Sequence, residues 1–150
     1  MPLRLACDAS SYGLGAVLSN VSPDGKERPV SFASRTLTSA EKNYSQIEKE
    51  ALSIIWAIKK FHIYLFGRKF TLLTDHKPLN YIFNATKGIS TTASGRLQRW
   101  CLFLSAYNYD IEYRKTNKHS NADCLSRLPL PNVDNDENEE QIFEINMIEY

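Results

Sequence analysis

Three carboxylates of this 150-residue chain lie where the surrounding sequence is apolar. Asp8 ends the run LRLACD and Asp75 ends the run KFTLLTD, and both runs have the residue pattern of a β-strand. Glu50 belongs to a helical pattern over residues 45–65, where it falls inside the apolar arc, whereas Glu48 falls outside it. A carboxylate that faces a protein core costs free energy unless a charged group meets it. These three acids are therefore candidates for a functional site.

Such a site requires a fold that brings the three acids together. If the strands that end at Asp8 and Asp75 are parallel neighbours, both acids emerge at the same end of a sheet, where sites in α/β proteins commonly lie. A helix packed on that sheet can bring Glu50 to the same place, and Asp123, at the start of a predicted short helix, is a fourth candidate. For Glu50, an arginine partner or a water-exposed position at the edge of the arc is the alternative.

Clustered carboxylates favour a particular chemistry. They repel one another, which raises their pKa values, and divalent cations relieve the repulsion. Mg²⁺ prefers oxygen ligands and keeps water molecules that a phosphate can displace. Two such ions about 4 Å apart can activate a water on one side of a phosphodiester and stabilise the leaving oxygen on the other. The spacing of the acids suggests metal-dependent phosphodiester hydrolysis without establishing it.

The rest of the pattern describes the elements that must position these side chains. Strands over residues 3–8 and 12–19 and a third around residues 30–33 are joined by short connections, which predicts an antiparallel meander. A helix, a strand, a short helix, a second long helix, a strand and a final short helix follow, over residues 45–65, 69–74, 78–83, 93–107, 109–114 and 121–127. This order predicts an α/β fold with a mixed five-stranded sheet flanked by helices, in which an antiparallel meander of strands one to three is followed by parallel strands four and five.

Length and composition indicate one folded domain over residues 1–129 and an acidic linker or disordered tail over residues 130–150. All 18 Lys and Arg residues lie before residue 129 together with ten of the 17 acidic residues, an excess of eight positive charges. This excess suits a polyanionic partner, although a generic solvated surface explains it as well. The three cysteines form no CxxC pair, which favours a reducing compartment over a disulfide framework. No apolar stretch approaches the roughly 18 residues of a membrane span.

Five segments, in the same order along the chain, resemble the ribonuclease H domains of gypsy-type LTR retrotransposon reverse transcriptases. They are LACDASSYGLG, SFASRTLTSAEKNYSQIEKEAL, LTDHKPL, RLQRWCLFLSAYNYDIEY and HSNADCLSRLP, which begin at residues 5, 31, 73, 96 and 119. The resemblance covers residues 3–129 and implies a ribonuclease H-like fold. It also implies that Asp8, Glu50, Asp75 and Asp123 form a site that holds two Mg²⁺ (or Mn²⁺) ions and hydrolyses the RNA strand of an RNA/DNA hybrid.

Selectivity for RNA requires a group that reads the 2′-hydroxyl. The small residues after Asp8, among them Ser10 and Gly13, would let the backbone approach the minor groove, although a plain turn explains them equally well. Arg96 and Arg99 are candidates for phosphate binding, and each taken singly is more simply an ordinary surface cation.

The histidines are less informative than the acids. His119, four residues before Asp123, is a candidate to assist the leaving group or product release, as a mobile histidine does in some members of the resembled family. Retroviral members place their histidine nearer the position of Tyr113, so this chain departs from that pattern. His62 and His76 are interpreted as structural.

The resemblance also implies a place in a polyprotein between a polymerase unit and an integrase unit. The chain contains neither the YxDD signature of a polymerase nor the HxH or CxxC pattern of an integrase, so polymerase activity would belong to the parent protein. The expected location is intracellular, in the cytoplasm, virus-like particles or the nucleus, with no membrane partner. Two alternatives stay open: a catalytically idle retroelement-derived domain that acts as a scaffold or hybrid-binding module, and a nuclease of the same fold that cuts DNA.

Overall fold

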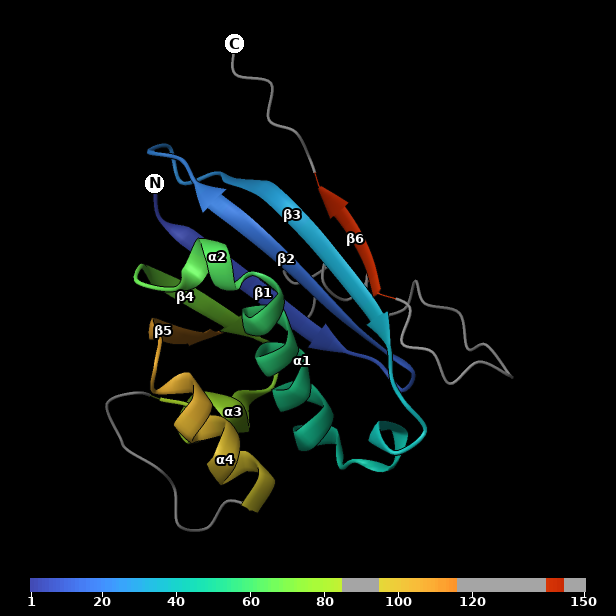
Figure 1. Cartoon of the computed structure of the whole chain (residues 1–150). Coiled ribbons are helices and arrows are strands. Elements are labelled where there is room, and N and C mark those ends of the chain that lie inside the picture. The colour runs from blue at the N-terminus through green and yellow to red at the C-terminus, as the bar shows by residue number, and fades with distance from the viewer. Residues whose placement is uncertain (85–94, 116–139, 145–150) are drawn as a thin grey trace.

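A mixed sheet runs through the protein, whose computed structural model describes residues 1–84, 95–115 and 140–144 (Figure 1). The strands lie in the order β5-β4-β1-β2-β3-β6. Their bounds are Leu3–Ala9 (β1), Gly13–Val21 (β2), Glu27–Thr36 (β3), Lys69–Thr74 (β4), Asn108–Tyr113 (β5) and Glu140–Glu144 (β6). Strands β1, β2 and β3 pair antiparallel, β4 is parallel to β1, and β5 is parallel to β4. The predicted arrangement of five strands is confirmed.

Strand β6 is an addition to that arrangement. It pairs antiparallel with residues 31–35 of β3 and so forms one edge of the sheet (Figure 1). The acidic composition around it predicts a linker or disordered tail over residues 130–150, whereas the structure places residues 140–144 in a strand. An open sheet edge offers backbone donors and acceptors to any extended segment, so pairing there does not require an apolar sequence. The division of the chain at residue 129 stays a prediction.

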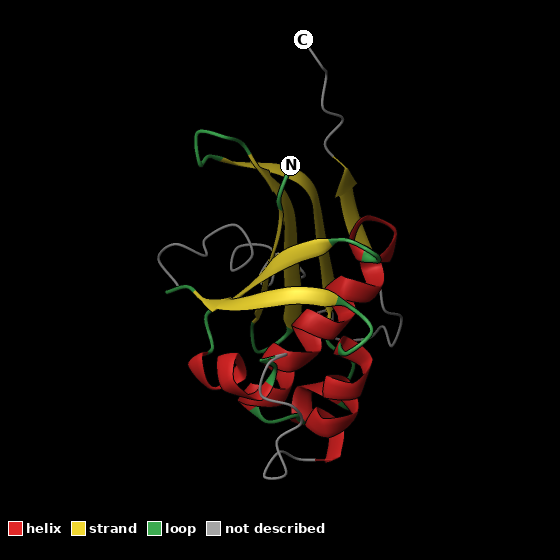
Figure 2. Cartoon of the chain, turned by 90° about the vertical axis from the view of Figure 1, so that its left-hand side faces the viewer, coloured by secondary structure: helices red, strands yellow, loops and turns green. Residues whose placement is uncertain are grey.

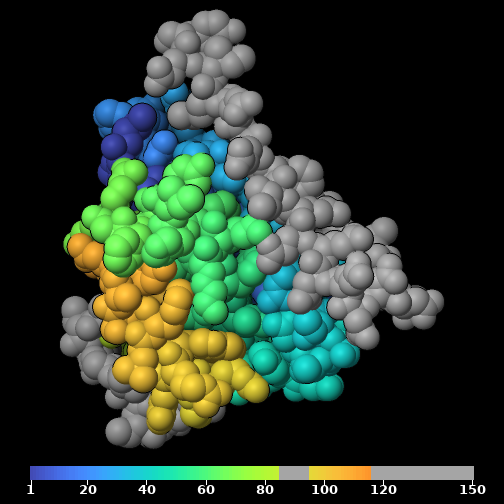
Figure 3. Space-filling view, in the orientation of Figure 1, coloured from blue at the N-terminus to red at the C-terminus, as the bar shows by residue number. Residues whose placement is uncertain are grey.

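Helices cover one face of the sheet. Those that the structure describes are a 3-10 helix η1 (Glu41–Asn43) and the α-helices α1 (Gln46–Lys60), α2 (His62–Leu65), α3 (Lys77–Ile82) and α4 (Gly95–Leu104). Helix α1 packs on β1 and β2, and α4 packs beside α1 (Figures 1 and 2). In the view of Figure 3, α1, α2 and α4 cover much of the sheet. None of these helices has the length and apolar composition that a membrane crossing requires.

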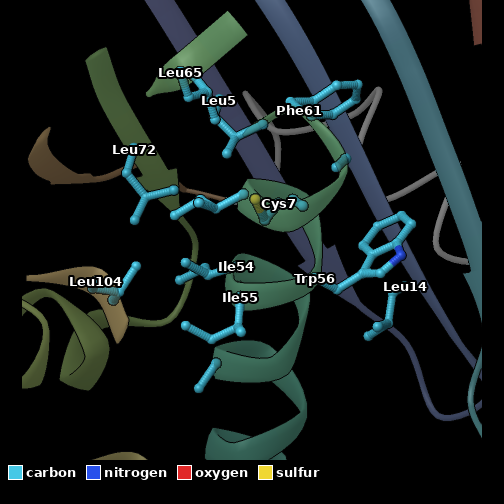
Figure 4. Close-up of a cluster of buried hydrophobic side chains, with 14 of the residues drawn as sticks. Leu5, Cys7, Leu14, Ile54, Ile55, Trp56, Phe61, Leu65, Leu72 and Leu104 are labelled. Atoms are coloured by element: carbon cyan, nitrogen blue, oxygen red, sulfur yellow. The ribbon is translucent and has the colours of Figure 1, made fainter. Parts of the chain in front are cut away.

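The apolar side of α1 fixes how the helix lies on the sheet. The helix begins where the Ser45 side chain accepts a hydrogen bond from the backbone N–H of Glu48, an N-cap. Its buried Ile54 and Ile55 belong to one core cluster with residues from three neighbouring strands (Figure 4): Leu5, Cys7, Leu14 and Leu72. Burial of each large apolar side chain stabilises the fold by about 1.5–3 kcal/mol. This packing therefore also fixes the position of the other α1 side chains, including Glu50.

The single helix that the sequence predicts over residues 45–65 is divided in two. Helix α1 ends at Phe61, whose backbone (φ −100°, ψ 23°) leaves the helical region, and α2 is one short turn. Gly67, with a φ of 77°, follows α2 and ends the segment as predicted. The apolar period continues across the break because Leu65 is buried, as Ile58 is, so the pattern does not reveal the break. The helix predicted over residues 121–127 lies outside the described residues.

Candidate metal centre

Two of the candidate acids lie at the same end of the sheet. In the parallel pairing of β1 and β4, Ala6 lies opposite Leu73, and the same register continued by two residues places Asp8 beside Asp75. Asp8 is the second-last residue of β1, and Asp75 directly follows β4. The strand pairing thus brings both acids to one sheet end, as the sequence predicts.

Glu50 reaches the two aspartates from helix α1, which packs on the face of the sheet. It lies on the second turn of α1, and one side-chain oxygen from each of Asp8, Glu50 and Asp75 lies within 4.8 Å of the others. Asp8 is 3% exposed and Glu50 is 6% exposed, whereas Asp75 is partly exposed. The cluster is therefore closed toward the core and accessible beside Asp75.

Among the described residues, the charges that act on Glu50 are those of the two aspartates. Burial raises the pKa of Glu50 to about 9, and the negative charges of Asp8 and Asp75 act in the same direction. A hydrogen bond from the Gln46 side-chain amide, at 3.0 Å from Nε2 to Oε1 of Glu50, opposes this rise. At neutral pH and without a bound cation, Glu50 is therefore protonated.

The alternative of an arginine partner for Glu50 is not what the structure shows. Arg96, which comes from α4, forms its ion pair with Glu48 at 2.9 Å, and its guanidinium lies 4.0 Å from the centroid of the Tyr44 ring. Across the described residues, Glu50 forms no ion pair, and the charges that act on it are negative. The helical arc separates the two glutamates correctly: Glu48 faces an arginine, and Glu50 faces the aspartates.

The donor atoms of the cluster fit a hard divalent cation. Oε2 of Glu50 is buried and has no hydrogen-bond partner among the residues that the structure describes. A buried polar atom without a partner is costly, and a cation at this point would satisfy it. The three side chains supply carboxylate oxygens, which Mg²⁺ and Mn²⁺ accept as ligands. The centre therefore has the composition of a Mg²⁺ or Mn²⁺ site.

The residues predicted to read the substrate lie near this centre but have local roles as well. Oγ of Ser10 accepts hydrogen bonds from the backbone N–H groups of Gly13 and Tyr12, at 3.1 and 3.4 Å, and the Ser10 N–H donates to the Gly13 carbonyl at 2.9 Å. These bonds close the turn between β1 and β2, directly after Asp8. The turn interpretation of Ser10 and Gly13 therefore has direct support, and a contact of this turn with substrate stays a prediction.

The two predicted phosphate-binding arginines differ in their surroundings. Arg96 is held by its ion pair and its ring contact, whereas Arg99, on the same helix, is exposed. Arg99 is thus the more accessible of the two. Two further predicted site residues, Asp123 and His119, lie outside the described residues, so the structure brings together three of the four predicted carboxylates.

The two described histidines lie outside the acidic cluster, and their structural role stays a prediction. His76 precedes α3 as its N-cap residue, and its backbone N–H donates to Oγ1 of Thr74 at 3.1 Å. Burial lowers the pKa of His76, although the charge of Asp75 acts in the opposite direction. Nδ1 of His62 lies 2.6 Å from the hydroxyl of Tyr107, at the surface between α2 and the turn before β5. Neither histidine is part of the acidic cluster.

Gln46 is the residue of this centre that the sequence analysis missed. It is the first residue of α1 and lies one helical turn before Glu50. Side chains four residues apart on a helix are neighbours, so this spacing could have revealed the contact once Glu50 was chosen.

Comparison with known proteins places this geometry in context. The sequence matches the family described as the RNase H-like domain found in reverse transcriptase, over residues 1–107. The retrovirus-related Pol polyprotein from transposon 297 of Drosophila melanogaster is 44% identical over 126 residues, which is 84% of this chain and 11% of that protein. The Pol polyprotein from transposon gypsy of the same species is 36% identical over 136 residues, 90% of this chain and 12% of that protein. The chain thus spans about a tenth of the length of the curated relatives it matches.

Solved structures share the fold. RNase H1 from the archaeon Halobacterium salinarum superposes with a TM-score of 0.61 at 19% identity, covering 83% of this chain and 94% of that one. LC11-RNase H1 in complex with an RNA/DNA hybrid superposes with a TM-score of 0.58 at 12% identity, covering 82% and 91%. At these identities the likeness concerns the fold alone, and it confirms the predicted ribonuclease H-like arrangement.

Proposed function

This chain belongs to the family of RNase H-like domains found in reverse transcriptase, and we propose that it hydrolyses the RNA strand of RNA/DNA hybrids within a retrotransposon Pol polyprotein. The observation that carries the proposal is the convergence of Asp8, Glu50 and Asp75, whose oxygens lie within 4.8 Å of one another. A scaffold would have no reason to keep such a repulsive cluster, because buried like charges oppose folding.

Asp8, Glu50 and Asp75 would hold the divalent cations, Mg²⁺ or Mn²⁺, and Asp123 is proposed as a fourth ligand on the strength of the family resemblance. When bound, two such ions supply the charge that activates a water and stabilises the leaving oxygen in an in-line displacement. The buried Oε2 of Glu50 is the atom of this chain that most needs such a partner.

The protein contributes a rigid frame for these ligands. Asp8 lies on a central strand and Glu50 on a helix held by the core, so their carboxylates keep their separation without reorganisation. Because burial raises the pKa of Glu50, its carboxyl group would release a proton to solvent on becoming a ligand. Because Asp75 is partly exposed, a scissile phosphate would approach from its side.

The ligands of similar solved structures support the proposed substrate, and the family resemblance supports the proposed partners. LC11-RNase H1 was solved with an RNA/DNA hybrid, and a foamy viral protease-reverse transcriptase was solved with the same kind of ligand. We propose that Arg99 contacts hybrid phosphates and that the turn from Ser10 to Gly13 faces the minor groove. The polymerase and integrase units of the parent polyprotein are the proposed protein partners, and an intracellular location is proposed with them.

The test is cleavage of a labelled RNA/DNA hybrid by the 150-residue chain with Mg²⁺, beside the Asp75→Asn variant. We expect wild type to cut the RNA strand and the variant to lose more than about 100-fold in rate, because changes outside the ligand set alone cost 10–100-fold. Hybrid binding without cleavage by wild type would instead support the scaffold alternative. Equal cleavage of duplex DNA would support a DNA nuclease.

A further inference from the structure

The two carboxylate oxygens of Glu50 have different surroundings. Oε1 accepts a hydrogen bond from Nε2 of Gln46 at 3.0 Å. Oε2 is buried and has no hydrogen-bond partner in the described part of the chain. One oxygen of the same side chain is therefore bound to the protein, and the other is available to a ligand.

This difference matters because the carboxylate group of a glutamate turns easily. Its terminal torsion has a broad, two-fold profile, so the two oxygens exchange places at little cost unless a neighbour holds one of them. For Glu50, the Gln46 amide is the side-chain neighbour that holds Oε1, and a backbone hydrogen bond from Ala9 also favours the charged carboxylate. Gln46 is exposed at the start of α1, so its own position is set by the helix rather than by burial.

We propose that Gln46 is a positioning residue of the metal centre: its amide N–H holds Oε1 of Glu50 and so presents Oε2 to the cation. This inference rests on the proposed function, since it assumes that the centre binds a divalent ion. It assigns a task to a side chain that is not itself a ligand, as hydrogen-bond donors behind metal ligands generally have.

The chemical type of residue 46 fits this task. A neutral amide donates a hydrogen bond to the carboxylate without cancelling the negative charge that attracts a cation. A lysine or arginine here would pair with Glu50 and compete with the ion. The arginine that does reach this part of α1, Arg96, is engaged by Glu48 instead. The ion pair with Glu48 thus holds Arg96, and among the described residues no ion pair involves Glu50.

The test compares the Gln46→Met variant with wild type by calorimetric titration of Mn²⁺ and Mg²⁺ into the 150-residue chain, without nucleic acid. Methionine has nearly the length and helix propensity of glutamine but lacks the amide donor. We expect cation binding to weaken about ten-fold, the lower end of the range for such donors, because Gln46 is exposed. The matched control is Gln98→Met on α4, a helix that contributes no residue to the described acidic cluster, and we expect it to bind cations as wild type does.

A shorter amide provides the second comparison. Gln46→Asn keeps the amide but lacks one methylene and cannot span the same distance, so we expect it to bind cations as weakly as Gln46→Met. Full affinity in the Asn variant would contradict the proposal, because reach would then be irrelevant. A crystal structure of wild type with Mn²⁺ should show Oε2 of Glu50 nearest to the ion, and Oε1 in that place would overturn the assignment.

Hybrid cleavage separates this role from a substrate contact. For Gln46→Met we expect the rate at low Mg²⁺ to fall and to recover at saturating Mg²⁺, with the KM for the hybrid unchanged. A raised KM with unchanged cation affinity would show that Gln46 binds substrate instead, and the proposal would fail. If wild type itself binds no cation in the titration, the proposed function fails. Equal cation binding by wild type and Gln46→Met is a different result, and it rejects the role of Gln46 alone.

Discussion

At the scale of single residues, Glu50 shows how a side chain of the site can lower the stability of the folded protein. Its carboxyl group is buried beside two aspartates and accepts a hydrogen bond from the Gln46 amide. Burial, with the charges of Asp8 and Asp75, raises its pKa from 4.5 to about 9. Functional sites commonly carry such destabilised groups because their task requires them.

The pH dependence of stability follows from this shift. Between about pH 4.5 and pH 9 the folded protein binds the Glu50 proton more tightly than the unfolded chain, so the free energy of unfolding decreases as pH rises through this window. In Glu50→Gln this loss is absent. We therefore expect the variant to gain stability relative to wild type as pH rises from 5 to 8, by up to about 1.4 kcal/mol for each pH unit. Urea unfolding with a chelator present measures the difference. Glu112→Gln, an exposed control on β5, should show no such gain, and a constant difference between Glu50→Gln and wild type would refute the expectation.

Single residues were also the scale at which sequence reasoning was most informative. Asp8 and Asp75 were found because each follows an apolar strand, and Glu50 was chosen over Glu48 because of its place on the helical arc. The role proposed for Gln46 has a weaker sequence signal, which is its spacing of four residues before Glu50. A glutamine at the exposed start of a helix has no unusual position until its contact with Glu50 is seen.

At the scale of elements, side-chain hydrogen bonds fix the connection between β3 and η1, which leads to α1. We call this connection the corner. The guanidinium of Arg35 binds both carboxylate oxygens of Glu41, at 2.6 and 3.0 Å. The Glu41 carboxylate accepts the N–H of Thr38 at 2.9 Å, and the N–H of Glu41 donates to the Thr38 hydroxyl at 3.1 Å, which is the reciprocal pattern of a capping box. Burial alone would raise the pKa of Glu41, but the bonds from Arg35 and Thr38 hold it below its ordinary value.

Removal of this carboxylate should destabilise the fold. Arg35 is 7% exposed, so Glu41→Ala would leave a buried guanidinium without its partner. We expect a loss of about 3 kcal/mol in the free energy of unfolding, measured in urea at neutral pH. Lys42→Ala, at the exposed neighbouring position, is the control and should change little. A loss below about 1 kcal/mol for Glu41→Ala would mean that the corner contributes no more than a surface ion pair.

Elements with a clear side-chain period were predicted, and those defined by the backbone alone were not. The five strands of the central sheet and helix α1 follow from alternation and helical spacing. The break at Phe61 is a local backbone change that leaves the apolar period intact. Strand β6 pairs through main-chain groups, and the acidic run that precedes it predicts a tail rather than a strand.

At the scale of the whole molecule, β6 covers the outer edge of β3 and becomes the edge strand itself. Strand β3 has β2 on one side and β6 on the other, so residues 31–35 have their backbone groups paired. Unpaired sheet edges are templates for other chains.

Shortening the chain should expose this edge. A chain that ends at residue 139 lacks β6, and we expect it to self-associate as concentration rises, because β3 then offers free donors and acceptors. A chain that ends at residue 144 keeps the strand and is the matched control. Sedimentation velocity over a range of concentrations measures the association. Identical monomeric behaviour of both chains would show that β6 does not protect the edge.

The parallel pairing of β1 with β4 also has a consequence for synthesis. Residues 3–6 pair with residues 70–73, so the centre of the sheet joins segments far apart in the chain. Non-local pairings of this kind fold slowly because the intervening loop must close first. A nascent polypeptide still held by the ribosome at β4 therefore lacks the pairing that brings Asp8 beside Asp75, and the acids gather only when the second half of the domain has emerged.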